Sequence, residues 1–197
     1  MGIQSETCRC SPIAAVSSPQ LGGSTRMADL TLGPRAGAKG VGLHAFLEAA
    51  GYAAGPTVNK AYRQTDGSLI ALLSPTEILW LGTSASDEAI TRWNCPDGQP
   101  LAPQTHLVPR SDGTYWFQLA GEGAEVALSR LCSVDFSHKN CPDLSVAQTL
   151  VARINTIVIH DRDAGESRFH LIGDVSLATY MWEALTSATT GILPHRA

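Results

Sequence analysis

The sequence predicts an α+β protein in which antiparallel sheets are covered by helices on one side. Short apolar segments typical of strands are interspersed with segments whose apolar residues recur at helical spacing. Their order follows a βαββα rhythm that is used roughly twice, unlike the strict strand–helix alternation of a parallel sheet. The 197 residues, 44% of them hydrophobic, are enough for one ordinary domain or two small halves.

The first part of the chain, residues 1–39, is predicted to be an extended arm. It is rich in Ser, Gly, Pro and Ala, and its charges sum to +2, whereas those of the remainder sum to −6. Ordering such a segment costs roughly 1–2 kcal/mol per residue, so it is ordered only where something holds it. The globular part is expected to span 40–197, with halves at about 40–110 and 111–197.

The first half is predicted to contain two helices. One presents Leu43 to the core and is followed by Gly51 as a C-terminal stop. The other follows Ser84 or Ser86, either of which can cap it, and turns Trp93 inward. Three strands are expected between them, at 58–63, 69–73 and 77–81.

The strand at 77–81 has an unusual pattern because both of its alternating faces are apolar. Ile78 and Trp80 share one face, and Leu79 and Leu81 share the other. A strand of this kind is covered on both sides.

The second half repeats the series and gives two halves of the ferredoxin-like type. A strand at 114–119 leads through a glycine-rich bend into a helix that presents Val126, Leu128 and Leu131. A last helix is expected to be capped by Ser176. The other strands are expected at 105–109, 148–153, 156–160 and 167–171, and the apolar face of the last helix contains Leu177, Tyr180, Met181, Ala184, Leu185 and Ala188.

Two tryptophans interrupt their local patterns. Trp116 alternates with Tyr115 and Phe117, which places it on the polar face of its strand, and Trp182 lies off the apolar stripe of the last helix. A large aromatic that points outward is either half-buried under a helix or an anchor for another subunit. We single out Trp116 and Trp182 as candidate partner-interface residues.

Composition excludes several classes of protein. No apolar run approaches the roughly 20 residues that cross a bilayer, and a net charge of −4 does not suit a nucleic-acid binder. Charged residues make up only 16% of the chain, as expected if another chain covers part of the surface; Ser, Thr, Gly and Ala on the outside would explain it equally well. The odd count of five cysteines and the absence of a recognisable signal peptide favour a cytoplasmic location with reduced thiols.

The chain contains no complete catalytic or cofactor motif. Residues 33–40 lack the Gly-Lys-Ser/Thr end of a phosphate loop, and 121–124 lack the third glycine of a dinucleotide fingerprint. A metal site is disfavoured because its candidate ligands do not have zinc-site spacing, and a thiol nucleophile is disfavoured because no third group orients its base. The residues considered for these roles are Cys132, Asp135, His138 and Cys141, with Cys8 and Cys10 as a second pair.

Four titratable residues lie across a predicted hairpin: His160, Asp161, Asp163 and His170. General acid–base chemistry is conceivable for such a group. A solvated end of a hairpin is the favoured interpretation. We therefore assign no catalytic, cofactor-binding or metal-binding residue to this chain.

Several short motifs, taken together, resemble a known family. The glycine-rich bend and its helix resemble the aminomethyltransferase-like, folate-binding domains. Further stretches, in the same order and at the same spacing, resemble the gamma subunit of heterotetrameric sarcosine oxidases. The motifs are Leu119–Ala124 with Leu128, Leu131-Cys132 and Asp135; Ser11–Ile13; Arg35 with Lys39-Gly40; Ser74–Gly82; Ala147–Arg153; Phe169–Leu171; and Tyr180–Leu185.

This resemblance implies an accessory, structural subunit without its own active site. The complex of that family oxidatively demethylates sarcosine to glycine with O₂, giving hydrogen peroxide and formaldehyde or methylene-tetrahydrofolate. The resemblance implies that FAD, FMN, NAD, tetrahydrofolate and zinc belong to the partner alpha, beta and delta subunits. The fold it implies is that of the aminomethyltransferase folate-binding domain, and Glu122 stands where the family pattern has proline.

Three alternatives remain open. The chain could belong to a related N-methyl amino acid dehydrogenase, which would share the architecture but not the substrate. It could be a stand-alone folate-binding one-carbon transferase, although no Asp lies in a matching motif. A thiol- or metal-dependent enzyme is the third.

Overall fold

The computed structural model describes residues 10–14, 25–93 and 103–190 of the chain. These residues form two five-stranded antiparallel sheets and four α-helices, which confirms the α+β class. No helix in the described ranges is long and apolar enough to span a membrane.

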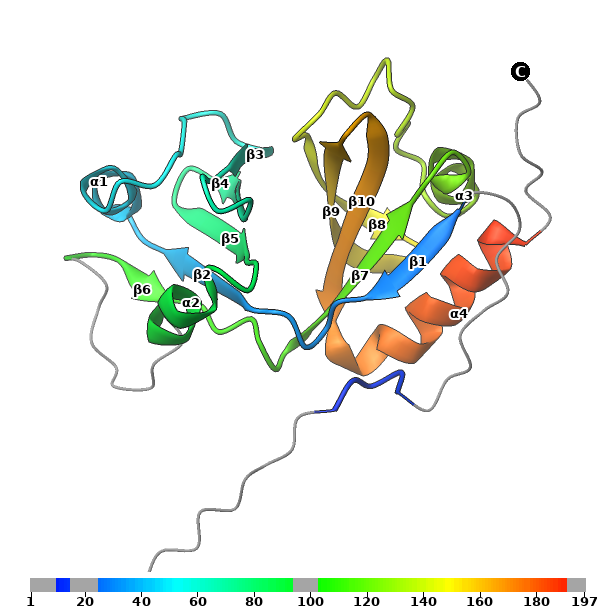
Figure 1. The fold of residues 1–197 in the computed structure, drawn as a ribbon, viewed down its shortest axis with the longest axis horizontal. Helices are drawn as coiled ribbons and strands as arrows, with labels where there is room; N and C mark the ends of the chain where they lie inside the picture. Colours follow the sequence, from blue (N-terminus) through cyan, green and yellow to red (C-terminus); the bar gives the residue numbers. More distant parts are fainter. Residues whose placement is uncertain (1–9, 15–24, 94–102, 191–197) are drawn as a thin grey trace, which may run out of the picture.

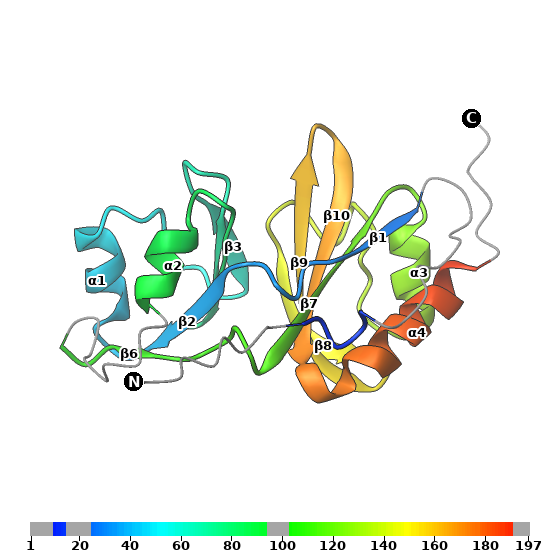
Figure 2. The same ribbon diagram turned by 60° about the horizontal axis from the view of Figure 1, so that its bottom comes forward.

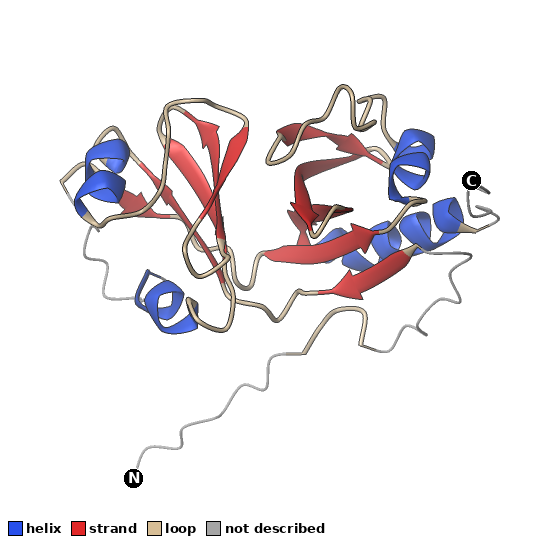
Figure 3. Cartoon of the chain, turned by 45° about the horizontal axis from the view of Figure 1, so that its top comes forward, coloured by secondary structure: helices blue, strands red, loops and turns tan. Residues whose placement is uncertain are grey.

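The elements are arranged in four layers, with helices outside and the two sheets in the middle (Figures 1 and 3). Helices α1 (Leu43–Ala49) and α2 (Asp87–Trp93) cover the outer face of the first sheet. Helices α3 (Ala124–Leu131) and α4 (Ala178–Thr189) cover the outer face of the second sheet. The inner faces of the sheets pack on each other, so each sheet is covered by helices on one side only, as the sequence predicts.

The two sheets have the same strand order. In the first sheet the order is β3-β4-β5-β2-β6, and in the second it is β8-β9-β10-β7-β1. Each half has three strands between its two helices, in agreement with the strands predicted one by one, whereas the βαββα rhythm names only two. The strands of the first sheet are β2 (Arg35–Lys39), β3 (Lys60–Arg63), β4 (Leu69–Ser74), β5 (Glu77–Leu81) and β6 (His106–Leu107); those of the second are β1 (Arg26–Asp29), β7 (Thr114–Ala120), β8 (Val146–Val151), β9 (Ile154–Asp163) and β10 (Glu166–Asp174).

The halves exchange their edge strands. Strand β1 precedes the first half but pairs with β7 in the second sheet, and β6 pairs with β2 in the first sheet. Within the predicted arm 1–39, Arg26–Asp29 and Arg35–Lys39 are thus strands held by the two sheets. The division into halves at about 40–110 and 111–197 stays a prediction. Residues 10–14 also contact the second half, because Ile13 is buried in its core; residues 1–9 and 15–24 lie outside the described part.

Two crossover segments connect the exchanged strands, and Figure 2 shows both running between the halves. The first joins β1 to β2, and the second joins β6 to β7. The fully buried guanidinium of Arg35 lies between them. It donates hydrogen bonds to five backbone carbonyls and one hydroxyl: the carbonyls of Thr31, Gly33, Arg110, Ser111 and Thr114, and Oγ1 of Thr114, at 2.5–3.1 Å.

Strand β5 is buried on both faces, as its sequence predicts. Ile78 and Trp80 pack in the core under α1 and α2, whereas Leu79 and Leu81 pack in the core between the sheets. This inter-sheet core includes Trp116. Burying apolar surface stabilises a protein by about 25 cal/mol per Å². The inter-sheet core therefore helps to hold the two halves together.

Three local predictions for the second half are wrong. Val126 is exposed, because Ala124, Ala127 and Leu128 form the buried face of α3. The carboxylate of Asp174, rather than Ser176, caps the turn before α4 by accepting the N–H of Ser176. The buried stripe of α4 is rotated from the predicted one, so that Leu177 and Tyr180 are exposed. Its buried members are Ala178, Met181, Trp182, Leu185, Ala188 and Thr189.

Candidate functional site

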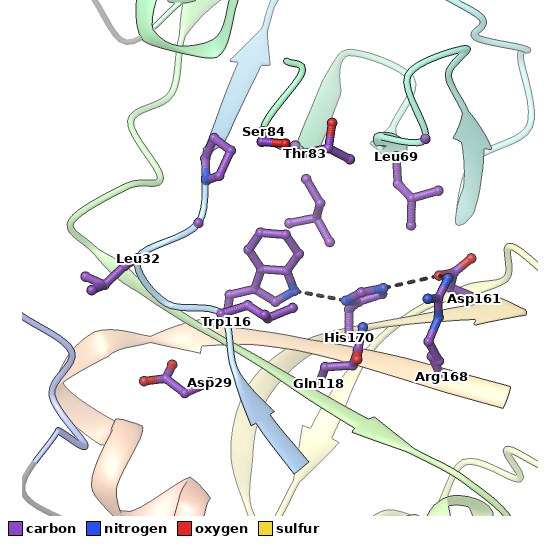
Figure 4. Close-up of a pocket in the computed structure, with 16 residues that line it drawn as sticks. Asp29, Leu32, Leu69, Thr83, Ser84, Trp116, Gln118, Asp161, Arg168 and His170 are labelled. Carbon is purple, nitrogen blue, oxygen red and sulfur yellow. Dashed lines mark hydrogen bonds and ion pairs between the residues drawn. The ribbon is translucent and has the colours of Figure 1, made fainter. Parts of the chain in front are cut away.

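A pocket of about 430 Å³ opens between the two sheets near the first crossover. Its size is within the range of small-molecule sites. Figure 4 shows a wall from the first sheet facing a row of polar side chains from the second. It is lined by Asp29, Leu30, Leu32, Gly33, Pro34, Gly67, Leu69, Leu81, Gly82, Thr83, Ser84, Trp116, Gln118, Asp161, Arg168 and His170.

A chain of three buried side chains forms the floor of the pocket. The indole Nε1–H of Trp116 donates to Nδ1 of His170 at 3.0 Å. Nε2 of His170 lies 3.5 Å from Oδ2 of Asp161. Since Nδ1 accepts a hydrogen bond, the proton of the neutral imidazole is on Nε2 and faces the carboxylate.

Asp161 joins the two halves electrostatically. Its Oδ1 is paired with Arg63 of β3, in the first sheet, and its Oδ2 accepts from Nη2 of Arg168 at 2.6 Å. Burial alone would raise the pKa of Asp161, but the hydrogen bonds of His170 and Arg63 and the charge of Arg168 outweigh it and hold the pKa well below its usual range. Asp161 is therefore a carboxylate at neutral pH.

The opposite wall is apolar and closely fitted. Leu69 and Leu81 reach into the pocket from the first sheet, and Leu32 is half exposed at its edge. Gly33 allows the crossover to approach the indole, since a Cβ there would lie 2.9 Å from Cζ3 of Trp116. Gly67, at φ +83°, has only Thr83 within 4 Å of a Cβ position. The site thus combines an apolar wall with a polar floor.

The structure brings together two of the four titratable residues of the predicted hairpin. Asp161 and His170 meet on the inner face of the second sheet and are buried, so the interpretation as a solvated hairpin end is wrong for them. That interpretation is also wrong for His160, which is fully buried on the outer face of the sheet, where it stacks on Phe169 and contacts the carbonyl of Cys141 through Nδ1. Asp163 ends β9, and its side chain lies outside the described part.

The candidate metal or thiol residues do not converge. Cys141 is buried, and burial raises the pKa of its thiol to about 11, which disfavours a thiolate nucleophile. His138 is exposed and contacts Arg162, while Cys132 lies 3.7 Å from the hydroxyl of Thr149. Among the described residues no group of three or more His, Cys, Asp or Glu could hold a metal ion. Cys8 lies outside these residues, and Cys10 is exposed.

Both candidate interface tryptophans are buried within this chain. Trp116 is 5% exposed in the core between the sheets. Trp182 is 6% exposed on the buried face of α4, where its ring meets Phe117 edge-on. The outward direction predicted from their patterns is wrong, because each sheet has a second covered face and the stripe of α4 is rotated. A contact with a partner subunit stays a prediction for both.

Sequence reasoning missed Gln118 and Arg168, which complete the polar floor with His170. Both lie in strands whose alternation would place them on one face, since Gln118 is directly opposite His170 in the register of β7 and β10. The missing information was that this face is half enclosed by the other sheet. Residues 33–40, considered as a phosphate loop, instead form the end of a crossover and strand β2.

Comparison with solved structures shows the fold of this chain. It is similar to a chain of the heterotetrameric sarcosine oxidase from Corynebacterium sp. U-96 in complex with pyrrole 2-carboxylate, with a TM-score of 0.73 and 16% identity. The match covers 96% of this chain and 98% of that chain. The expected similarity of fold to a chain of such an oxidase is thereby confirmed.

A second similar structure is aminomethyltransferase T of the glycine cleavage system from Bartonella henselae. The TM-score is 0.61 at 11% identity, and the match covers 84% of this chain but 46% of that chain. No protein-family model and no curated protein matches the sequence. Taken together, the chain has an aminomethyltransferase-like α+β fold, in the form found in a heterotetrameric oxidase.

Proposed function

We propose that this chain is the small accessory subunit, of the gamma type, in a heterotetrameric oxidase that demethylates sarcosine to glycine. The observation that carries the proposal is the end-to-end match with one chain of such an oxidase. Because 96% of this chain and 98% of the other are covered, the two have nearly the same extent. The motifs at 74–82 and 147–153 support the same assignment.

Its role in this proposal is structural. The charged groups around the pocket are engaged with one another, as Asp161 is with Arg63 and Arg168, which suits a scaffold better than a reaction centre. The flavins FAD and FMN, NAD, tetrahydrofolate and zinc would then be held by the alpha, beta and delta subunits. O₂ would be reduced to hydrogen peroxide there. We expect the complex to be cytoplasmic.

A one-carbon transferase that binds folate on its own is the second candidate. The similarity to aminomethyltransferase T favours it, but this chain spans about half the length of that protein. A subunit of an N-methyl amino acid dehydrogenase would share the fold and differ in substrate and electron acceptor.

The test is to co-express the tagged chain with the large and medium flavoprotein subunits of a heterotetrameric sarcosine oxidase. We expect a flavin-containing complex that oxidises sarcosine and produces hydrogen peroxide. The same flavoprotein subunits without this chain should assemble poorly. If sarcosine is inert and another N-methyl amino acid reduces the flavin without O₂ uptake, the dehydrogenase alternative holds.

A further inference from the structure

We propose that the pocket between the two sheets is a binding site for a small uncharged carboxamide with an apolar body. The proposed function gives this chain a structural role and no ligand. A ligand site here would therefore be an additional property of the chain. Three properties of the pocket lead to this class of ligand: the pairing of its charges, the position of Gln118 and the shape of its apolar wall.

The charges around the pocket balance, because the carboxylates of Asp29 and Asp161 stand against the guanidinium groups of Arg63 and Arg168. Oδ2 of Asp161 accepts from Arg168 at 2.6 Å, Oδ1 is paired with Arg63, and His170 lies 3.5 Å away. An anionic ligand would have to approach the Asp161 carboxylate, and a cationic one the two guanidinium groups. Because a charge brought into a largely buried site needs its own partner, a neutral head group is favoured.

Gln118 provides the hydrogen-bonding groups that such a head requires. Its side chain comes from β7 into the pocket, beside His170, which is opposite it in the sheet (Figure 4). Among the described residues its carboxamide makes no hydrogen bond, although Trp116, His170, Asp161 and Arg168 around it all do. A carboxamide offers both an acceptor and donors, so a second carboxamide is its natural complement.

The remaining walls fit an apolar body. Leu69 and Leu81 face the ligand from the first sheet, and the crossover adds Leu30, Leu32 and Pro34. Gly67 leaves this wall free of a side chain at one position, since only Thr83 lies within 4 Å of where its Cβ would be. The volume of about 430 Å³ accommodates a six-membered ring with its amide and leaves room for a few waters.

The probe is cyclohexanecarboxamide, titrated into the full ¹⁵N-labelled chain, alone or within its complex. We expect saturable shifts of the Trp116 indole N–H resonance, which is identified by its absence in Trp116→Phe. Cyclohexanecarboxylate, which has the same shape and a negative charge, should bind at least tenfold more weakly. Equal binding of the carboxylate, or no saturable shift with the amide, would overturn the proposal.

Two variants and one control locate the site. Gln118→Leu should weaken amide binding at least tenfold, and Ser84→Trp, a change at an exposed residue on the pocket's edge, should block entry. Asn155→Leu makes the same kind of change at an exposed residue of the same sheet outside the pocket, and should leave binding unchanged. If Ser84→Trp and Gln118→Leu bind like the parent, the amide lies elsewhere and the assignment is wrong. Because assembly with the partner subunits is measured separately, a failure to bind the amide would leave the proposed function standing.

Discussion

Trp116 and His170 are joined by a hydrogen bond of 3.0 Å from the indole nitrogen to Nδ1 in the interior between the two sheets. The bond fixes the imidazole tautomer that presents Nε2–H to Asp161. It therefore connects β7 through β10, the central strand of the second sheet, to a carboxylate that is paired with Arg63 of the first sheet.

Removing the Trp116 donor should be costly. Trp116→Phe keeps an aromatic ring but leaves Nδ1 of buried His170 without its donor, and such a loss typically costs about 1–3 kcal/mol beyond the change in packing. Trp182→Phe is the matched control, because within the described residues the buried Nε1 of Trp182 has no hydrogen-bond partner. Urea unfolding should show the larger loss for Trp116→Phe. Equal losses would mean that the bond contributes nothing net.

Asp161 should make the stability depend on acid pH. Its pKa is lowered in the folded state relative to about 3.9 in an unfolded chain, so the unfolded state binds more protons as the pH falls. The stabilisation is present above about pH 5 and is lost progressively below pH 4. In Asp161→Asn the urea midpoint of unfolding should fall less between pH 5 and pH 3 than it does in the parent protein. If the urea midpoint of this variant falls as much as that of the parent, other carboxylates cause the loss of stability at acid pH.

Arg35 should be essential for connecting the halves. A lysine at this position has one ammonium group and cannot reach the four carbonyls on the two crossovers and the fifth at the start of β7, so several buried acceptors lose their donor. We expect Arg35→Lys to lower the free energy of unfolding by about 3–5 kcal/mol. Arg92→Lys, at an exposed residue of α2, is the control and should change it by less than about 0.5 kcal/mol.

The partner-interface prediction for the tryptophans needs a control for folding. Trp116→Ala and Trp182→Ala are expected to loosen assembly while the flavin chemistry of the remaining complex stays largely intact. Because both side chains are buried, each change should also destabilise this chain by about 3–5 kcal/mol. Trp80→Ala removes a ring of equal size from the core under α1 and α2. If Trp80→Ala loosens assembly equally, the effect comes from stability; if all three assemble normally and turnover is lost, the scaffold role is wrong.

The sequence predicted local structure well where periodicity is strong. The bounds of β5 agree with the apolar segment at 77–81, and its burial on both faces followed from that pattern. Strands β1 and β2 were missed because segments of four and five residues carry little periodicity and their partners lie far along the chain. The strand expected at 105–109 is present as β6, but no feature of the sequence indicated that it pairs with β2. The exchange of edge strands created the crossovers, and with them the buried site of Arg35.

The pocket was only partly predictable. Asp161 and His170 were singled out as titratable residues across a hairpin, but their burial depends on packing by the other sheet. Gln118 gave no signal of its own, since a polar residue in alternation is typical of a solvated face. Pairing of β7 with β10 placed it beside His170.

The most direct test of the accessory-subunit assignment is native mass spectrometry of the tagged chain after co-expression with its flavoprotein partners. We expect one copy of this 20.8 kDa chain in a hetero-oligomer with one copy of each larger subunit. The chain produced alone should be poorly soluble or associate with itself. A soluble monomer of 20.8 kDa that remains unassociated in the presence of those partners would contradict the assignment.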